Sequence, residues 1–145
     1  MNFSMIGTGV SGCSNGASIF GCCNDKIALK SYHGKYVVAE DNGKANANRK
    51  TRHSWEEFTV EDLGSDEIAL KSHHGKYLVA ESNHEVNANR PKRGPWEIFK
   101  VLKQPDGTYG FMTAHGRYLV AEGNGRLRGD RKELNNWEKF TPECI

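Results

Sequence analysis

Clusters of arginine and lysine in three segments are the residues best suited to bind a ligand. The segments read Arg49-Lys50-Thr51-Arg52-His53, Arg90-Pro91-Lys92-Arg93 and Arg126-Leu127-Arg128-Gly129-Asp130-Arg131-Lys132. Guanidinium and ammonium groups attract phosphate, sulfate and carboxylate groups. We predict that an anionic partner, either a protein filament, acidic phospholipid or a sulfated glycan, contacts Arg49, Lys50, Arg52, Arg90, Lys92, Arg93, Arg126, Arg128, Arg131 and Lys132. Solvated loop charges, offset by nearby glutamates, would explain the same pattern.

A second set combines carboxylate, amide, basic and tyrosine side chains, and it also occurs three times. Hydroxyl groups of a sugar bond to such polar groups, while an aromatic ring packs against its C–H face. The residues of this alternative carbohydrate site are Lys35, Tyr36, Glu40, Asn42, Asn46, Lys76, Tyr77, Glu81, Asn83, Asn87, Arg117, Tyr118, Glu122 and Asn124. Asn and Glu at strand ends also commonly satisfy the backbone of turns.

Motifs for catalysis are weak. The run from His84 to Ala88 begins like the zinc-protease motif, but Ala88 stands where the second histidine must be. A catalytic centre needs unlike groups that converge on one point, whereas this chain offers the same groups three times. We therefore expect a protein without catalytic residues, metal site or cofactor.

A repeat of 41 residues positions both sets. The stretches 27–40, 68–81 and 109–122 align without gaps, and so do Trp55, Trp96 and Trp137. A repeat of this period is one supersecondary unit that buries its apolar face only against its copies. The repeats run over about 27–67, 68–108 and 109–145, after an extension of residues 1–26 rich in Gly, Ser and Cys.

Apolar residues alternate with period two in each repeat, which predicts strands. In the first repeat we expect strands at about 26–32, 35–39, 45–48 and 57–60, with turns at His33-Gly34 and Asn42-Gly43. A β-propeller would need four to eight repeats of this kind as its blades, but this chain has three. Twelve strands closed around a pseudo-threefold axis leave no exposed sheet edges, so the prediction is an all-β fold, a β-trefoil of three four-stranded repeats.

The same register predicts the core. Phe58, Phe99 and Phe140, with Leu29, Leu70 and Met112, should fill the barrel in threefold layers. Val37 and Ala39 should face it, with Val38 on the opposite side. The three tryptophans are interpreted as apolar bodies that seal the junctions between strands, and the histidines of the His-Gly turns as equally structural.

Charge, hydropathy and cysteine content limit the partners and the cellular compartment that the sequence predicts. A formal charge of +2 gives no indication of nucleic-acid binding, and no apolar run approaches the roughly 20 residues that cross a bilayer. Cys13, Cys22 and Cys23 precede the repeats, and Cys144 follows Thr141, where the aligned part of the third repeat ends, so we interpret all four as free thiols of a soluble, cytoplasmic protein. The alternative is a bridge from Cys144 to Cys22 or Cys23, because a closed fold brings the chain ends together. Ile19 and Phe20 should pack on the domain or on a second copy.

The repeat resembles that of the fascin-like β-trefoils. The resemblance is carried by His-Gly-Lys-Tyr-Leu-Val-Ala-Glu at 74–81, Asn-Ala-Asn-Arg at 87–90 and Gly-Pro-Trp-Glu-x-Phe at 94–99. It implies a non-enzymatic scaffold, and actin-bundling fascins belong to that superfamily. Fascins carry four such domains in tandem, whereas this chain has one.

Two functions remain in view. The preferred one is association with, or cross-linking of, F-actin through the basic loops, with homodimerisation through the N-terminal extension. The alternative is a multivalent lectin with one shallow sugar site per repeat, which leaderless secretion could deliver outside the cell.

Overall fold

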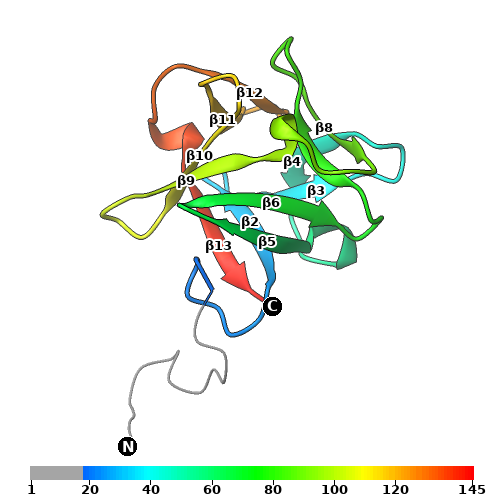
Figure 1. Ribbon diagram of the computed structural model, residues 1–145. Coiled ribbons are helices and arrows are strands. Elements are labelled where there is room, and N and C mark those ends of the chain that lie inside the picture. Colours follow the sequence, from blue (N-terminus) through cyan, green and yellow to red (C-terminus); the bar gives the residue numbers. More distant parts are fainter. Residues whose placement is uncertain (1–17) are drawn as a thin grey trace, which may run out of the picture.

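Residues 18–145 are described in the computed structural model, and they form an all-β structure (Figure 1). Twelve strands and three single-turn 3₁₀ helices occur in this part of the chain. The first elements are β2 Lys26–Ser31, β3 Tyr36–Ala39, β4 Ala45–Arg49, η1 Ser54–Glu56 and β5 Phe58–Gly64. Next come β6 Glu67–Ser72, β7 Tyr77–Ala80, β8 Val86–Arg90, η2 Pro95–Glu97 and β9 Phe99–Lys103. The last are β10 Tyr109–Met112, β11 Tyr118–Ala121, β12 Leu127–Arg131, η3 Asn136–Glu138 and β13 Phe140–Cys144.

Six of these strands form a closed barrel. Around the ring, β2 pairs with β5, β5 with β6, β6 with β9, β9 with β10, β10 with β13, and β13 returns to β2, all antiparallel. A closed ring has no edge strand exposed to pairing by another chain. The predicted strands are therefore present, and most of their ends fall within one or two residues of the prediction.

The other six strands form three hairpins that meet one another. These are β3–β4, β7–β8 and β11–β12. Isolated bridges join Lys44 to Asn87, Asn46 to Arg126 and Glu85 to Arg128. Gly43 and Gly125, at turns with positive φ, lie against Asn89 and Asn48, where a Cβ would approach to 2.9 and 2.8 Å. The hairpins thus close one end of the barrel.

The core contains the residues predicted for it, except at one position in the third repeat. Phe58, Phe99 and Phe140 are buried, as are Leu29 and Leu70. Met112 is not part of the core cluster, and Phe111 is fully buried in its place. Phe111 lies 41 residues after Leu70, whereas Met112 corresponds to Lys71. The prediction for Met112 was therefore wrong: it pairs with Tyr118 on the outer side, as Lys30 pairs with Tyr36.

The first strand of each hairpin is buried on both faces, which the alternating pattern did not predict. Val38, Val79 and Val120 are fully buried yet lie outside the main core cluster. Each 3₁₀ helix contacts the first strand of a hairpin: η1 contacts β3, η2 contacts β7, and η3 contacts β11. These short helices therefore cover the outer face, and Val38 faces a second, smaller apolar layer.

The two ends of the described chain lie side by side below the barrel (Figure 1). Cys22 and Cys144 form a disulfide, with Cα atoms 5.5 Å apart, and no cysteine in the described residues is a free thiol. The free-thiol interpretation was therefore wrong for the three described cysteines, and the alternative bridge from Cys144 to Cys22 is confirmed, because barrel closure places β13 beside β2. Cys13 lies outside the described residues. The Phe20 ring meets Tyr109 edge-on at 5.0 Å, and Ile19 packs with it against the core, as expected. The dimer contact predicted in the extension falls largely on residues 1–17, outside the described part.

Across residues 18–145, the structure contains no helix with the length and hydropathy of a membrane span.

Candidate functional site

Arginines at the end of each hairpin are held by carboxylates of the same hairpin. Glu40 accepts hydrogen bonds from Arg49 at 2.6 Å and from Asn46 at 3.0 Å. Glu81 accepts the equivalent bonds from Arg90 and Asn87. These residues come from both predicted sites, the basic and the sugar-binding one. The structure joins the two sets into one network that braces the hairpin, so these groups are not free for a ligand.

The third hairpin keeps the network with different partners. Arg131 donates to Glu122 at 2.9 Å and to Asp130 at 2.6 Å, and Arg128 donates to Asp130 at 3.1 Å. Partial burial would raise the pKa of Asp130, but the Arg128 hydrogen bond and the charge of Arg131 outweigh it and lower the pKa. Burial would likewise lower the pKa of Arg131, but Glu122 and Asp130 raise it.

A second pair of networks lies where the barrel strands meet the hairpins, at what we call the seam sites. At the first, Glu143 accepts from Tyr36 and Arg52, both at 2.8 Å. At the second, Glu61 accepts from Tyr77 at 2.8 Å and from Arg93. The hydrogen bond to the carboxylate is the main reason that the pKa of each tyrosine is raised.

The third seam site is apolar. Leu102 stands where the others have Glu61 and Glu143, and Leu134 stands where they have arginine. Leu134 packs directly over Gly110, because a Cβ there would lie 2.2 Å from its Cδ1. Tyr118 consequently lacks the carboxylate partner of its counterparts, and no hydrogen bond of its hydroxyl occurs in the described residues.

The predicted sugar-binding set is divided by the fold. Asn42, Asn83 and Asn124 each accept a backbone N–H two residues later, which stabilises the turn. Lys76 joins Glu40 and Asn42 across the junction of two repeats, with His74, around a hollow of about 190 Å³. Arg117 donates to the Asp130 carbonyl at 3.4 Å. One sugar pocket per repeat was predicted; Tyr36 and Tyr77 bond at the seam sites and are not among the residues that line the hollow of Glu40, Asn42 and Lys76.

Four of the ten predicted cationic residues form no ion pair within the described residues. Lys50, Lys92 and Lys132 are exposed, one in each loop that precedes a 3₁₀ helix. Arg126 lines a small hollow of about 110 Å³ between the hairpins, together with Lys44 and Glu85. The six remaining arginines are paired. Among the ten predicted residues, the three loop lysines and Arg126 are therefore the cations that remain without an ion pair in the described part of the chain.

Each loop also carries a tryptophan that contacts a histidine of the next repeat. Trp55 meets His74, Trp96 meets His115, and Trp137 meets His33, edge-to-face with centroids 4.8 to 5.0 Å apart. The Nε2 of each histidine lies 2.9 to 3.0 Å from a backbone carbonyl across the same junction, that of Ala39, Ala80 or Ala121. The structural role predicted for these residues is thus supported, but Trp96 and Trp137 remain 38% and 40% exposed.

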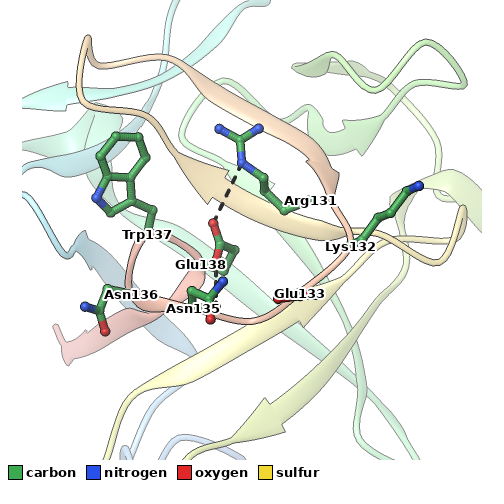
Figure 2. Close-up of a pocket in the computed structure, with 7 residues that line it drawn as sticks. All are labelled: Arg131, Lys132, Glu133, Asn135, Asn136, Trp137 and Glu138. Carbon is green, nitrogen blue, oxygen red and sulfur yellow. Dashed lines mark hydrogen bonds and ion pairs between the residues drawn. The ribbon is translucent and has the colours of Figure 1, made fainter.

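The Trp137 loop borders a hollow of about 550 Å³, larger than that of about 310 Å³ beside Trp55. Figure 2 shows the Arg131 side chain extending toward Glu138, and Lys132 extending away from Trp137. Glu138 is buried and accepts the backbone N–H of Asn135 at 2.6 Å, as Glu56 does for His53. The buried glutamates therefore hold the loops in shape, and Glu138 also forms an ion pair with Arg131 at 4.0 Å.

Sequence reasoning missed the exposed tryptophan faces as candidate contacts. Their recurrence at 41-residue spacing indicated a structural role, but the polar residues around each tryptophan differ between copies. At the two positions before Trp137 stand Asn135 and Asn136, where the other copies have His53 and Ser54 or Gly94 and Pro95. This difference between the copies was the sequence signal that could have identified the Trp137 loop as a candidate contact surface.

The family model of the fascin domain matches residues 32–142 of the chain. Among curated proteins, none matches the chain.

Proposed function

The chain belongs to the fascin-domain family, and from this premise we propose that it is a non-enzymatic binding module that associates with actin filaments. The three four-stranded units of 41 residues, related by a pseudo-threefold axis, would form a β-trefoil that presents one contact loop each. Triplication of the loop would let one module touch more than one filament, so that cross-linking would not need a dimer.

The observation that carries this proposal is an unpaired lysine that precedes a partly exposed tryptophan by four or five residues in each of the three loops. Lys50, Lys92 and Lys132 form no ion pair within residues 18–145, and each lies within about five residues of its tryptophan. A lysine without an internal partner keeps its full attraction for an acidic filament surface. An exposed indole adds apolar contact area of the kind that dominates protein interfaces.

Co-sedimentation with F-actin tests the proposal. We expect Lys50→Glu/Lys92→Glu/Lys132→Glu to abolish pelleting at micromolar protein and physiological salt, and the wild type to lose affinity as salt rises. The matched control is Lys26→Glu, which reverses an exposed lysine at the start of β2, more than 20 residues from each of the three loop lysines. Wild-type protein that stays in the supernatant would end the actin proposal.

Glycan binding is the second candidate, and the Cys22–Cys144 disulfide favours it. Disulfides persist in oxidising compartments and are rare in the cytosol. Actin binding would place the protein in the cytoplasm, with Cys22 and Cys144 reduced, whereas glycan binding would place it outside. The redox state of the native protein, read as a mass shift after alkylation of its thiols, separates the two locations, and a glycan array tests the ligand.

A further inference from the structure

We propose that the Trp137 loop forms a single subsite for a neutral sugar, with the indole as stacking platform and the amides of Asn135 and Asn136 as hydrogen-bonding groups. The inference rests on the glycan candidate named above. It differs from the threefold sugar site expected from sequence, both in its residues and in its number. The hollow of about 550 Å³ at this loop falls in the range of small-ligand sites.

The aromatic surface here is longer and barer than at the other two junctions. Tyr32 meets His33 at 5.7 Å, His33 meets Trp137 at 4.8 Å, and Tyr32 is 60% exposed. At the other two junctions, the position of Tyr32 is occupied by His73 and Ala114. A row of rings with exposed faces suits the C–H face of a sugar.

Gly123 is the second distinguishing feature, because it lies beside the Trp137 ring. A Cβ at this position would come within 3.6 Å of Cη2 of the indole. The other copies carry Asp41 and Ser82 there, whose side chains start from that same Cβ. Glycine therefore leaves this part of the indole uncovered in the third copy.

The hydrogen-bonding groups are also specific to this loop. Asn135 and Asn136 are exposed, and within the described residues their side-chain amides form no hydrogen bond. An amide has two donors and an acceptor oxygen, which matches the paired hydroxyl groups of a sugar. Gly94 and Pro95, at the same positions in the second loop, offer no side-chain donor or acceptor.

Charge balance at the hollow points to a neutral ligand. Arg131 is already paired with Glu122 and Asp130, and Glu138 is occupied by the Asn135 backbone. Of the remaining lining residues, Lys132 and Glu133 carry opposite charges, and Lys132 extends away from Trp137 (Figure 2). Neither sign of charge therefore dominates, and hydroxyl groups are the chemistry that the free amides match.

A glycan array followed by calorimetric titration of the best-bound sugar tests the subsite. We expect Trp137→Ala, Asn135→Ala/Asn136→Ala and Gly123→Asp each to weaken binding by at least about tenfold. The matched control is Trp96→Ala, which removes an indole of nearly equal exposure, 38% against 40%, with the same histidine contact. Its affinity should stay within about twofold of the wild type.

Each result bears on one of the two claims. Equal loss in Trp96→Ala and Trp137→Ala, or an unchanged affinity in both the amide variant and Gly123→Asp, would overturn the single subsite but leave glycan binding in place. An array without any wild-type signal would overturn both. Gly123→Asp and the amide variant alter exposed positions, so they should fold even where a tryptophan variant does not.

Discussion

Replacing Gly110 by alanine tests the packing of the apolar seam site. The new Cβ would lie 2.2 Å from Cδ1 and 3.0 Å from Cγ of Leu134, so the leucine must leave its position. Overpacking of this kind costs about 1–3 kcal/mol. Alanine is better than glycine inside a strand by about 0.5–1 kcal/mol, so we expect a net loss of about 1 kcal/mol in the free energy of unfolding, read from the midpoint of urea denaturation.

The other two seam sites supply the control. Gly110 is the cross-strand partner of Leu102, just as Ala69 is the partner of Glu61 and Ala28 that of Glu143. At this position, alanine is therefore compatible with the arginine of the first two seam sites, but it would clash with Leu134 at the third.

In a Leu134→Arg background, Gly110→Ala should consequently become neutral or stabilising by up to about 1 kcal/mol. The same loss in both backgrounds would show that Leu134 is not the cause. A single variant more stable than the wild type would refute the packing argument outright.

Three further changes have defined outcomes. Cys22→Ala/Cys144→Ala should lower the free energy of unfolding by about 3–5 kcal/mol in urea denaturation, because the bridge spans 122 residues of the unfolded chain; an unchanged midpoint would contradict this. Tyr77 should keep its proton above its ordinary pKa of 10.0, so the stability that it contributes is full below that pH and is lost as pH rises through the raised pKa. Tyr77→Phe should remove that loss and the share of high-pH tyrosinate absorbance that comes from Tyr77, while Tyr36, whose pKa is also raised, keeps its own share; an identical titration would refute it. His74→Ala should cost about 1–3 kcal/mol in thermal or urea unfolding, since one carbonyl hydrogen bond and one indole contact disappear; a loss within error would rule out a bracing role.

Strand positions and barrel closure were predictable because two signals agree over the whole repeat. Alternation with period two gives strands, and an ungapped offset of 41 residues gives three equivalent units. Met112 was misplaced only because the third copy was shifted by one residue relative to Leu70. Burial of Val38 on the outer face was not predictable, because it depends on a 3₁₀ helix that begins sixteen residues later.

The ion pairs were harder to predict than the strands. The pairs within one hairpin differ in this respect from the pairs that join distant parts of the chain. The Arg49–Glu40 spacing of nine residues recurs as Arg90–Glu81 and Arg131–Glu122, so sequence could have revealed it. Glu143 and Arg52 are 91 residues apart and meet only after the barrel closes. The Cys22–Cys144 bridge depends on the same closure, which explains why composition alone favoured free thiols.

In this chain, the residues repeated in all three copies differ in role from the residues found in only one copy. Side chains present in all three copies, such as the Arg49–Glu40 pair and the histidines at the tryptophans, make internal contacts. Reversing Arg49 would therefore unpair Glu40 in the hairpin and report on folding rather than on filament binding. Among the candidate contact residues, the three loop lysines form no ion pair and the amides of Asn135 and Asn136 form no hydrogen bond within the described residues. A variant of these groups changes ligand affinity without a change in the unfolding midpoint if the proposals are correct, and parallel loss of both quantities would assign them to the scaffold instead.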